Sequence, residues 1–209
     1  MELVLRRPRT ESEYERVLRT QLEVINEMAR VVEQLLAVAH AEDGQWAVDW
    51  KPAELGPLVQ AVREIYQGIA NQKQVALEIF EQEQVWVRGE ATLLERLIAN
   101  LVENALKHTP AGGKVKIELI RRNGEAVCKV EDTGAGIPAE EMPRLFDKFF
   151  TQKTALQQGA QSTGIGLGLC RWIAEVHQGK IEVASPPGRG AVFTVLLPLF
   201  EPEMISQVS

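Results

Sequence analysis

The segment at residues 100–110, NLVENALKHTP, places two asparagines, Asn100 and Asn104, four positions apart. In a helix this spacing puts both carboxamides on one face, about one turn apart. Because asparagine is unfavourable in the middle of a helix, two of them on one face suggest a function. Their neutral oxygens suit a hard cation such as Mg²⁺, and Lys107 lies close enough to reach phosphates bound to that cation. Taken alone, the segment fits a solvated helix face with a cation at its end better than a metal site.

A second segment, VEDTGAGIP at residues 130–138, follows an expected strand. Asp132 stands where that strand ends, and a carboxylate there can accept a hydrogen bond from an exocyclic amine such as that of adenine. Gly134 and Gly136 allow the backbone to turn and to approach a ligand closely. By itself the segment fits an ordinary turn into a helix, with Asp132 as the helix cap, better than a base pocket.

A third segment, STGIGLGL at residues 162–169, opens an expected helix with glycine at alternate positions. Consecutive backbone N–H groups at a helix N-terminus form a natural phosphate site. The segment is not a dinucleotide fingerprint, because Leu169 stands where the last glycine is required. It is not a P-loop either, because Ile165 replaces the required lysine.

Between these segments lies RLFDKFF at residues 144–150, a cation set among aromatic rings. Phe146 and the two phenylalanines after Lys148 are at helical spacing, so plain core packing explains them. The functional interpretation is an anchor for the polar loop at residues 151–162, with Lys148 offering its charge to a terminal phosphate.

The composition of the 209 residues is that of a globular protein, with 45% hydrophobic and 25% charged residues. The net charge of −6 argues against a nucleic-acid partner. The longest apolar stretch, residues 191–200, has about half the roughly 20 residues of a membrane span, and the charged start MELVLRRPRT is not a secretion signal. Two isolated cysteines predict neither a disulfide framework nor a zinc site, which fits a reducing cytoplasm.

The apolar pattern changes near Gly44. Residues 10–42 carry a wide heptad stripe, which favours a bundle of helices between molecules over a helix packed on its own domain. We therefore expect a helical segment at 1–44 that packs between molecules, which the family resemblance described below implies is part of a dimerisation hairpin, one domain at 45–200 and a tail at 201–209. In that domain we expect helices at about 52–71, 92–108 and 165–177, a hairpin turning at Asn123-Gly124, and two last strands at 181–184 and 191–197. Strands that are mostly hairpin-linked predict an α+β fold, a two-layer α/β sandwich preceded by a long N-terminal helix.

The four segments, in this order, resemble the catalytic domain of histidine kinases, in the Bergerat-type ATP-binding family that also includes gyrase, mismatch-repair ATPases and heat-shock chaperones. The resemblance covers about residues 45–198. Residues 100–108 are similar to the N box, 132–137 to the first glycine box, 146–150 to the phenylalanine box and 164–168 to the second glycine box. Each box is a weak signal alone, but four in register are a strong one.

The resemblance implies a set of ligands for ATP and Mg²⁺. Asp132 would bind the adenine amino group, and Asn104 would ligate Mg²⁺ with Asn100 nearby as a ligand or phosphate contact. Lys107 would contact the phosphates, and His108 would lie against the nucleotide where the family often has tyrosine. Residues 151–162 would form the ATP lid. The remaining implied ATP-binding residues are Gly134, Gly136, Ile137, Phe146, Lys148 (in place of a common arginine), Thr163, Gly164, Ile165, Gly166, Leu167 and Gly168.

One position separates kinase from ATPase within the resemblance. ATPase relatives carry a glutamate four residues before the metal-binding asparagine, whereas this chain has Asn100, which cannot act as a general base. The nucleophile would then be a histidine. The chain has three histidines, of which His108 belongs to the N box. Neither His40 nor His177 is followed by the acidic residue and Arg-Thr-Pro-like tail of a phosphoacceptor box.

The sequence therefore predicts the ATP-binding catalytic part of a sensor histidine kinase, without its phosphoacceptor histidine and unable to phosphorylate itself. Residues 10–42 resemble the second helix of the family's dimerisation hairpin, which implies a homodimer, a histidine-bearing helix and a response regulator as partners. The expected location is the cytoplasmic part of a membrane-bound sensor. The alternative is a non-catalytic ATP-binding regulator or dimerising adaptor, and Asn100 opposes an ATPase.

Overall fold

The computed structural model describes residues 50–81, 84–147, 166–186 and 188–201, together with Tyr14 and Val17. The chain divides into two units, Met1–Gly44 and Gln45–Ser209, and the fold described here is that of the second. Tyr14 and Val17 are helical. The rest of the helix expected over residues 10–42 lies outside the described residues.

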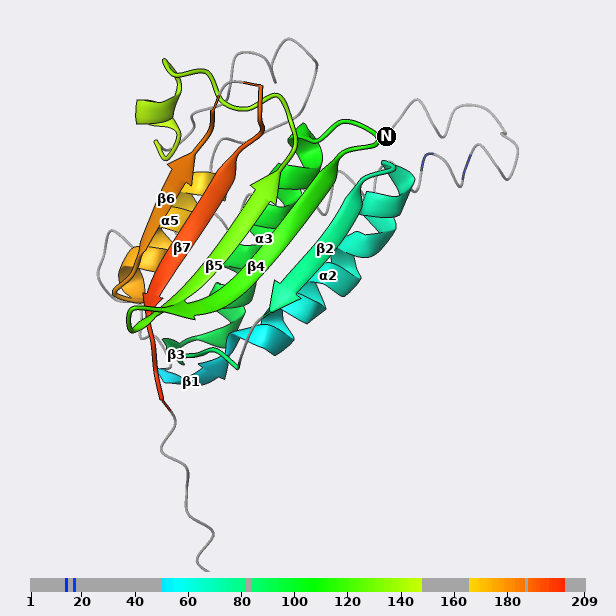
Figure 1. The fold of residues 1–209 in the computed structure, drawn as a ribbon. Helices are drawn as coiled ribbons and strands as arrows, with labels where there is room; N and C mark the ends of the chain where they lie inside the picture. The colour runs from blue at the N-terminus through cyan, green and yellow to red at the C-terminus, as the bar shows by residue number, and fades with distance from the viewer. Residues whose placement is uncertain are drawn as a thin grey trace, which may run out of the picture. The chain divides into compact units, whose positions relative to one another are not determined.

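The domain is built on a five-stranded sheet with the order β2-β4-β5-β7-β6 (Figure 1). Its strands are β2 (Ala76–Glu81), β4 (Lys114–Arg122), β5 (Glu125–Asp132), β7 (Val192–Pro198) and β6 (Lys180–Ala184). The β2–β4 pair is parallel and the other neighbours are antiparallel. Two shorter strands, β1 (Lys51–Glu54) and β3 (Trp86–Gly89), form a separate antiparallel pair. The hairpin between β4 and β5 turns at Asn123 and Gly124, which both have positive φ, as the sequence predicts.

Three helices cover one face of this sheet, and together they make the predicted two-layer α+β sandwich (Figure 1). They are α2 (Leu55–Gln72), α3 (Ala91–His108) and α5 (Gly166–Val176). A short 3₁₀ turn, η1 (Met142–Arg144), lies between β5 and α5. None of the helices in the described part of the chain is both long and apolar enough to cross a membrane.

The core lies between the helices and the sheet, where the strand alternation and the helical stripe meet. Val115, Ile117 and Leu119 of β4 are fully buried, and Leu97 and Leu101 of α3 pack in the same core. Burial of apolar side chains such as these is the main favourable term in the stability of the domain. Because the apolar stripe of α3 faces the sheet, the polar side chains of that helix lie along its flanks.

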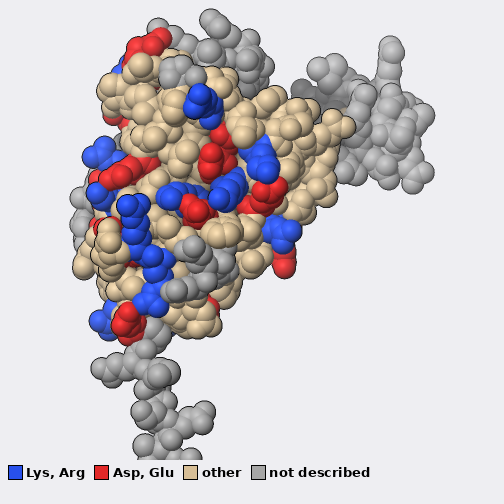
Figure 2. Space-filling view, in the orientation of Figure 1, with Lys and Arg blue, Asp and Glu red and all other residues tan. Residues whose placement is uncertain are grey.

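The other face of the sheet is covered with charged side chains. Figure 2 shows Lys and Arg interspersed with Asp and Glu across this face. Lys129 Nζ lies 2.8 Å from Glu118 Oε2, and Lys114 Nζ lies 3.0 Å from Glu78 Oε1. Exposed pairs of this kind add little stability each, but they keep the open face of the sheet soluble.

The prediction of a helix beginning at Pro52 is wrong. Residues Lys51–Glu54 form β1, in which Pro52 pairs with Arg88, and α2 begins only at Leu55. Proline is tolerated both at the first position of a helix and in an edge strand, because either place lacks a partner for its missing N–H. Pairing of Ala53 with Val87 buries both side chains, and this long-range contact decides in favour of the strand.

Candidate functional site

Asp132 is the last residue of β5 and is buried, with 4% of its surface exposed. Its backbone N–H donates to the carbonyl of Ala191 at 2.9 Å, and its Oδ1 accepts the N–H of Gly134 at 2.8 Å. Burial raises the pKa of this carboxyl group, and the backbone N–H groups of Gly134 and Ala191 oppose that rise. The position thus holds a buried carboxylate whose Oδ1 is fixed by Gly134, and a carboxylate has further acceptor sites that suit a ligand amine.

The glycines after Asp132 bring this loop against the end of α3. A Cβ atom added to Gly134 would lie 2.4 Å from the carbonyl oxygen of His108. Gly136 has φ of +79°, and its added Cβ would lie 3.0 Å from Ser185 Oγ. Such distances leave no space for a side chain, so glycine is required at both positions. Ile137, at the end of the loop, is buried.

Asn100 and Asn104 lie on the flank of α3, and both are half-buried. Asn100 Nδ2 is a buried donor that has no hydrogen bond of good geometry among the described residues, although the amide lies close enough to the Cys170 thiol to lower the pKa of that thiol. Its Oδ1 would lie 3.9 Å from a Cβ added to Gly166, the first residue of α5. An unpaired buried amide costs stability unless a ligand satisfies it. A phosphate oxygen of a bound ligand could accept a hydrogen bond from this amide, which would remove that cost.

The described residues contain no group of three His, Cys, Asp or Glu side chains that could hold a metal ion. The described residues therefore do not form a site in which protein side chains alone coordinate a metal ion. They do fit Mg²⁺ bound mainly through substrate phosphates and water, with an amide oxygen of Asn104 as a protein ligand.

The second glycine segment meets the other two segments at the start of α5. Gly166, Leu167 and Gly168 are half-buried in the first turn of that helix. A Cβ added to Gly168 would lie 3.3 Å from the carbonyl oxygen of Phe146, itself half-buried after η1. The sequence positions near 100, 146 and 166 are thereby brought together. Lys148, Thr163, Gly164, Ile165 and the expected lid at 151–162 lie outside the described residues.

Positive charge gathers at the C-terminal end of α3. Lys107 and His108 form its last turn, and Lys73 Nζ donates to the carbonyl of Leu106 at 3.0 Å. Burial, with Lys107 and then Lys73 as further causes, lowers the pKa of His108, so its imidazole is neutral at pH 7. Lys73 was missed in the sequence, because the contact joins residues 33 positions apart and no local pattern signals it.

The β6–β7 connection was also missed as part of the site. Ile137 N–H donates to Ser185 Oγ at 2.7 Å, and a Cβ added to Gly190 would collide with the carbonyl oxygen of Asp132. In the sequence, the two glycines Gly188 and Gly190 indicate a tight turn between the strands, and both have positive φ in the structure. They do not indicate which segment this turn contacts.

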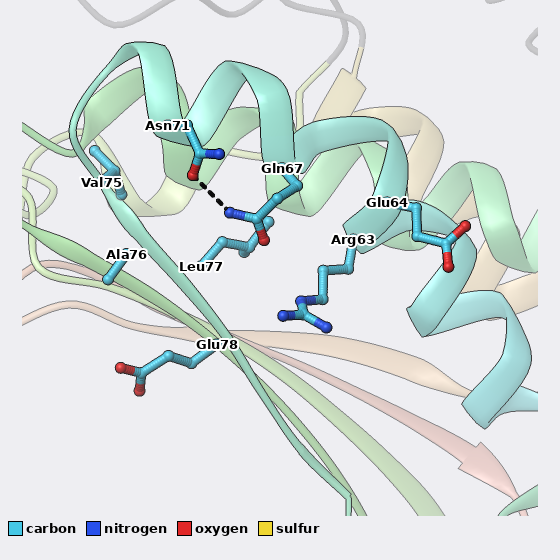
Figure 3. Close-up of a pocket in the computed structure, with 8 residues that line it drawn as sticks. All are labelled: Arg63, Glu64, Gln67, Asn71, Val75, Ala76, Leu77 and Glu78. Atoms are coloured by element: carbon cyan, nitrogen blue, oxygen red, sulfur yellow. Dashed lines mark hydrogen bonds between the residues drawn. The ribbon is translucent and has the colours of Figure 1, made fainter.

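A separate groove of about 550 Å³ lies between α2 and the edge strand β2 (Figure 3). The Arg63 side chain extends into it, and Gln67 Nε2 donates to Asn71 Oδ1 at 2.8 Å along its wall (Figure 3). Its other lining residues are Glu64, Val75, Ala76, Leu77 and Glu78. It contains none of the residues implied in ATP binding and is distinct from the candidate nucleotide site.

A two-layer sandwich with a buried acidic residue at a strand end, paired asparagines on α3 and a glycine-rich start to α5 defines an ATP-binding domain of the Bergerat class. Residues 89–201 match the family described as histidine kinase-, DNA gyrase B-, and HSP90-like ATPase, and the chain belongs to this family. Within it, the chain is the ATP-binding catalytic part of a sensor histidine kinase.

The relatives agree with this assignment. The chain is 33% identical to the sensor histidine kinase TmoS of Ectopseudomonas mendocina, over 84% of this chain and 18% of TmoS. It is 32% identical to the sensor histidine kinase CusS of Escherichia coli K12, over 94% of this chain and 41% of CusS. The chain therefore spans less than half the length of these two relatives. The solved catalytic domain of histidine kinase ThkA has a TM-score of 0.64 and 30% identity, covering 72% of this chain and 95% of that one.

Proposed function

We propose that this chain presents Mg²⁺ and ATP for transfer of the γ-phosphoryl group to a histidine on a dimerisation helix. An imidazole nitrogen would form a bond to the γ-phosphorus while the bond from that phosphorus to the bridging oxygen breaks. ADP would leave and the histidine would lose its proton. The phosphoryl group would then pass to an aspartate of a response regulator. Catalysis of this kind consists mainly of orientation and charge neutralisation.

The observation that carries the proposal is the buried Asp132 carboxylate at the end of β5, which the N–H of Gly134 holds in place. The Asn100 amide, which has a buried nitrogen on α3 and an oxygen facing Gly166, is a second polar group of the site. The first suits the amino group of adenine and the second suits a phosphate oxygen. ATP binding to the domain follows from its family, whereas the roles of individual residues and of Mg²⁺ at Asn104 are part of the proposal.

Asn100 also favours phosphoryl transfer over hydrolysis. An amide cannot accept a proton from water, so the residue at this position does not activate water as a glutamate could. ATP bound here is therefore preserved for another nucleophile.

We propose that this nucleophile comes from outside the described residues. His177 is 3% exposed and uses both ring nitrogens, since Nε2 accepts from Glu90 N–H at 3.1 Å and Nδ1 donates to Ile173 O at 2.8 Å. His108 is half-buried beside two lysines. This arrangement keeps a second candidate open, a non-catalytic ATP-binding regulator or a dimerising adaptor that acts through residues 1–44. We propose a cytoplasmic location for either function, because ATP and response regulators are found there.

A mixing experiment separates the candidates. The protein and γ-labelled ATP are added to a separate helical hairpin that carries a phosphoacceptor histidine, and acid-labile label on the hairpin is measured. Label on the hairpin supports the kinase, tight ATP binding without transfer supports the regulator, and steady release of phosphate supports an ATPase. Failure to bind ATP at all would refute the proposal. The Asn104→Ala variant serves as a control that retains the base pocket but should transfer poorly.

A further inference from the structure

The loop from Asp132 to Ile137 is held at both ends by the same connection, the one between β6 and β7. At its start, Asp132 N–H donates to the carbonyl of Ala191 at 2.9 Å. At its end, Ile137 N–H donates to Ser185 Oγ at 2.7 Å. The Ser185 hydroxyl donates in turn to the carbonyl of Gly190 at 2.8 Å. The two ends of the loop are therefore tied together through one short stretch of backbone.

The same connection also packs against the middle of the loop. A Cβ added to Gly136 would lie 3.0 Å from Ser185 Oγ and 3.2 Å from the carbonyl oxygen of Gly190. Gly190 has φ of +75° and lies directly against the carbonyl of Asp132. Because the Ser185 hydroxyl donates one hydrogen bond and accepts another, its orientation is fixed.

We infer that Ser185 is a positioning residue for the adenine pocket, which sets the distance between the Asp132 carboxylate and the backbone at Ile137. This inference rests on the proposed function, since it assumes that Asp132 receives the adenine amino group. Ser185 acts through Ile137 and Gly190, and no contact of its own with the nucleotide is needed. Without the hydroxyl, Ile137 N–H loses its partner and the end of the loop is released, while Asp132 stays in β5.

Loss of the Ser185 hydroxyl should weaken recognition of the adenine base and leave binding of the phosphates unchanged. The groups that suit phosphates lie on α3 and at the start of α5, and the hydrogen bonds of Ser185 go to Ile137 and Gly190 instead. A looser loop should therefore weaken the preference for adenine, whose amino group donates to Asp132. Guanine carries an acceptor oxygen in place of the amino group of adenine, so a guanine nucleotide bound in the same orientation gains no hydrogen bond from the Asp132 carboxylate.

The test measures the dissociation constants of ATP and GTP by calorimetry for the full chain and two variants. Ser185→Ala should weaken ATP binding by about 5- to 150-fold, the effect of one lost hydrogen bond that leaves its partner unsatisfied. The ATP-to-GTP affinity ratio should fall by a similar factor. Ser185→Thr, which keeps the hydroxyl, should restore both values to within about threefold of the wild-type protein.

The matched control is Val195→Ala, which removes buried methyl groups from the middle of β7, opposite Cys128. It should lower the melting temperature and leave the ATP-to-GTP ratio unchanged. An unchanged ratio in Ser185→Ala, an equal loss of ATP and GTP affinity, or no rescue by Ser185→Thr would overturn the inference. Failure of the wild-type protein to bind ATP would instead refute the proposed function.

A measurement on the wild-type protein applies even if Ser185→Ala does not fold. Because Ile137 N–H is hydrogen-bonded to Ser185, its amide hydrogen should exchange slowly without nucleotide, although it lies in a loop. Exchange at the rate of an open loop would overturn the inference.

Discussion

Replacing Asp132 by asparagine should change nucleotide affinity and fold stability in opposite directions. Asparagine keeps the shape of the side chain and its Oδ1 can still accept the N–H of Gly134. Its second group becomes an N–H₂ donor, which would face the donor amino group of adenine. Loss of one hydrogen bond to a charged group costs about 1.5–3 kcal/mol, so ATP should bind about 10- to 150-fold more weakly.

The stability effect follows from the pKa of the same group. Burial raises the pKa of Asp132 above its ordinary value of 3.8, so the ionised carboxylate destabilises the folded state at neutral pH. Asp132→Asn should therefore raise the melting temperature at pH 7 to 8 without nucleotide. The advantage should disappear as the pH falls toward 3.8, because the wild-type carboxyl is then protonated in the folded state. Calorimetric titration with ATP and thermal unfolding over this pH range measure both effects. Equal ATP affinity in the two proteins, or a lower melting temperature in the variant at pH 7, would refute the reasoning.

Other variants test the remaining parts of the site. Asn104→Ala should weaken ATP binding about tenfold with Mg²⁺ present and hardly at all with a chelator, and an equal loss in both conditions would contradict a metal role. Gly190→Ala should destabilise the domain by about 3 kcal/mol or more, because its Cβ would collide with the Asp132 carbonyl at a strained φ. Gly188 has φ of +71° but open space around it, so Gly188→Ala should lower the free energy of unfolding, measured with denaturant, by only about 1 kcal/mol. An equal loss in both variants would argue against the close contact between Gly190 and Asp132. His177→Phe should flatten the dependence of stability on pH. Burial lowers the pKa of His177 in the folded state, so protonation favours the unfolded chain and the free energy of unfolding of the wild-type protein should fall as the pH drops below about 6.5. If the variant shows the same dependence on pH, another group is responsible.

Local patterns in the sequence were enough to predict the central elements of the fold. Alternating apolar residues and the Asn123-Gly124 turn predict the β4–β5 hairpin, because both the register and the turn depend on neighbouring residues. The spacing of Asn100 and Asn104 predicts their common face on α3 for the same reason.

What the sequence did not reveal depends on contacts between distant segments. Pro52 suits a helix start or an edge strand, and only the pairing with β3 decides between them. Ser185 is an ordinary serine by every local criterion, and its importance appears only when Ile137, 48 positions away, donates to it. The resemblance to a known family supplied the roles of the boxes, because each box alone fits a plain structural explanation.

The candidate pocket is assembled from segments near residues 100, 132, 166 and 190, which meet only when β5 is paired with β7 and α5 is packed on α3. A partly folded chain would therefore have no binding site, and nucleotide would act as a ligand of the fully folded state alone. At a concentration about 100 times the dissociation constant, ATP would shift the unfolding equilibrium by about 2.7 kcal/mol. In a cell rich in ATP, a newly made chain would thus gain its nucleotide and the last part of its resistance to proteolysis in the same step.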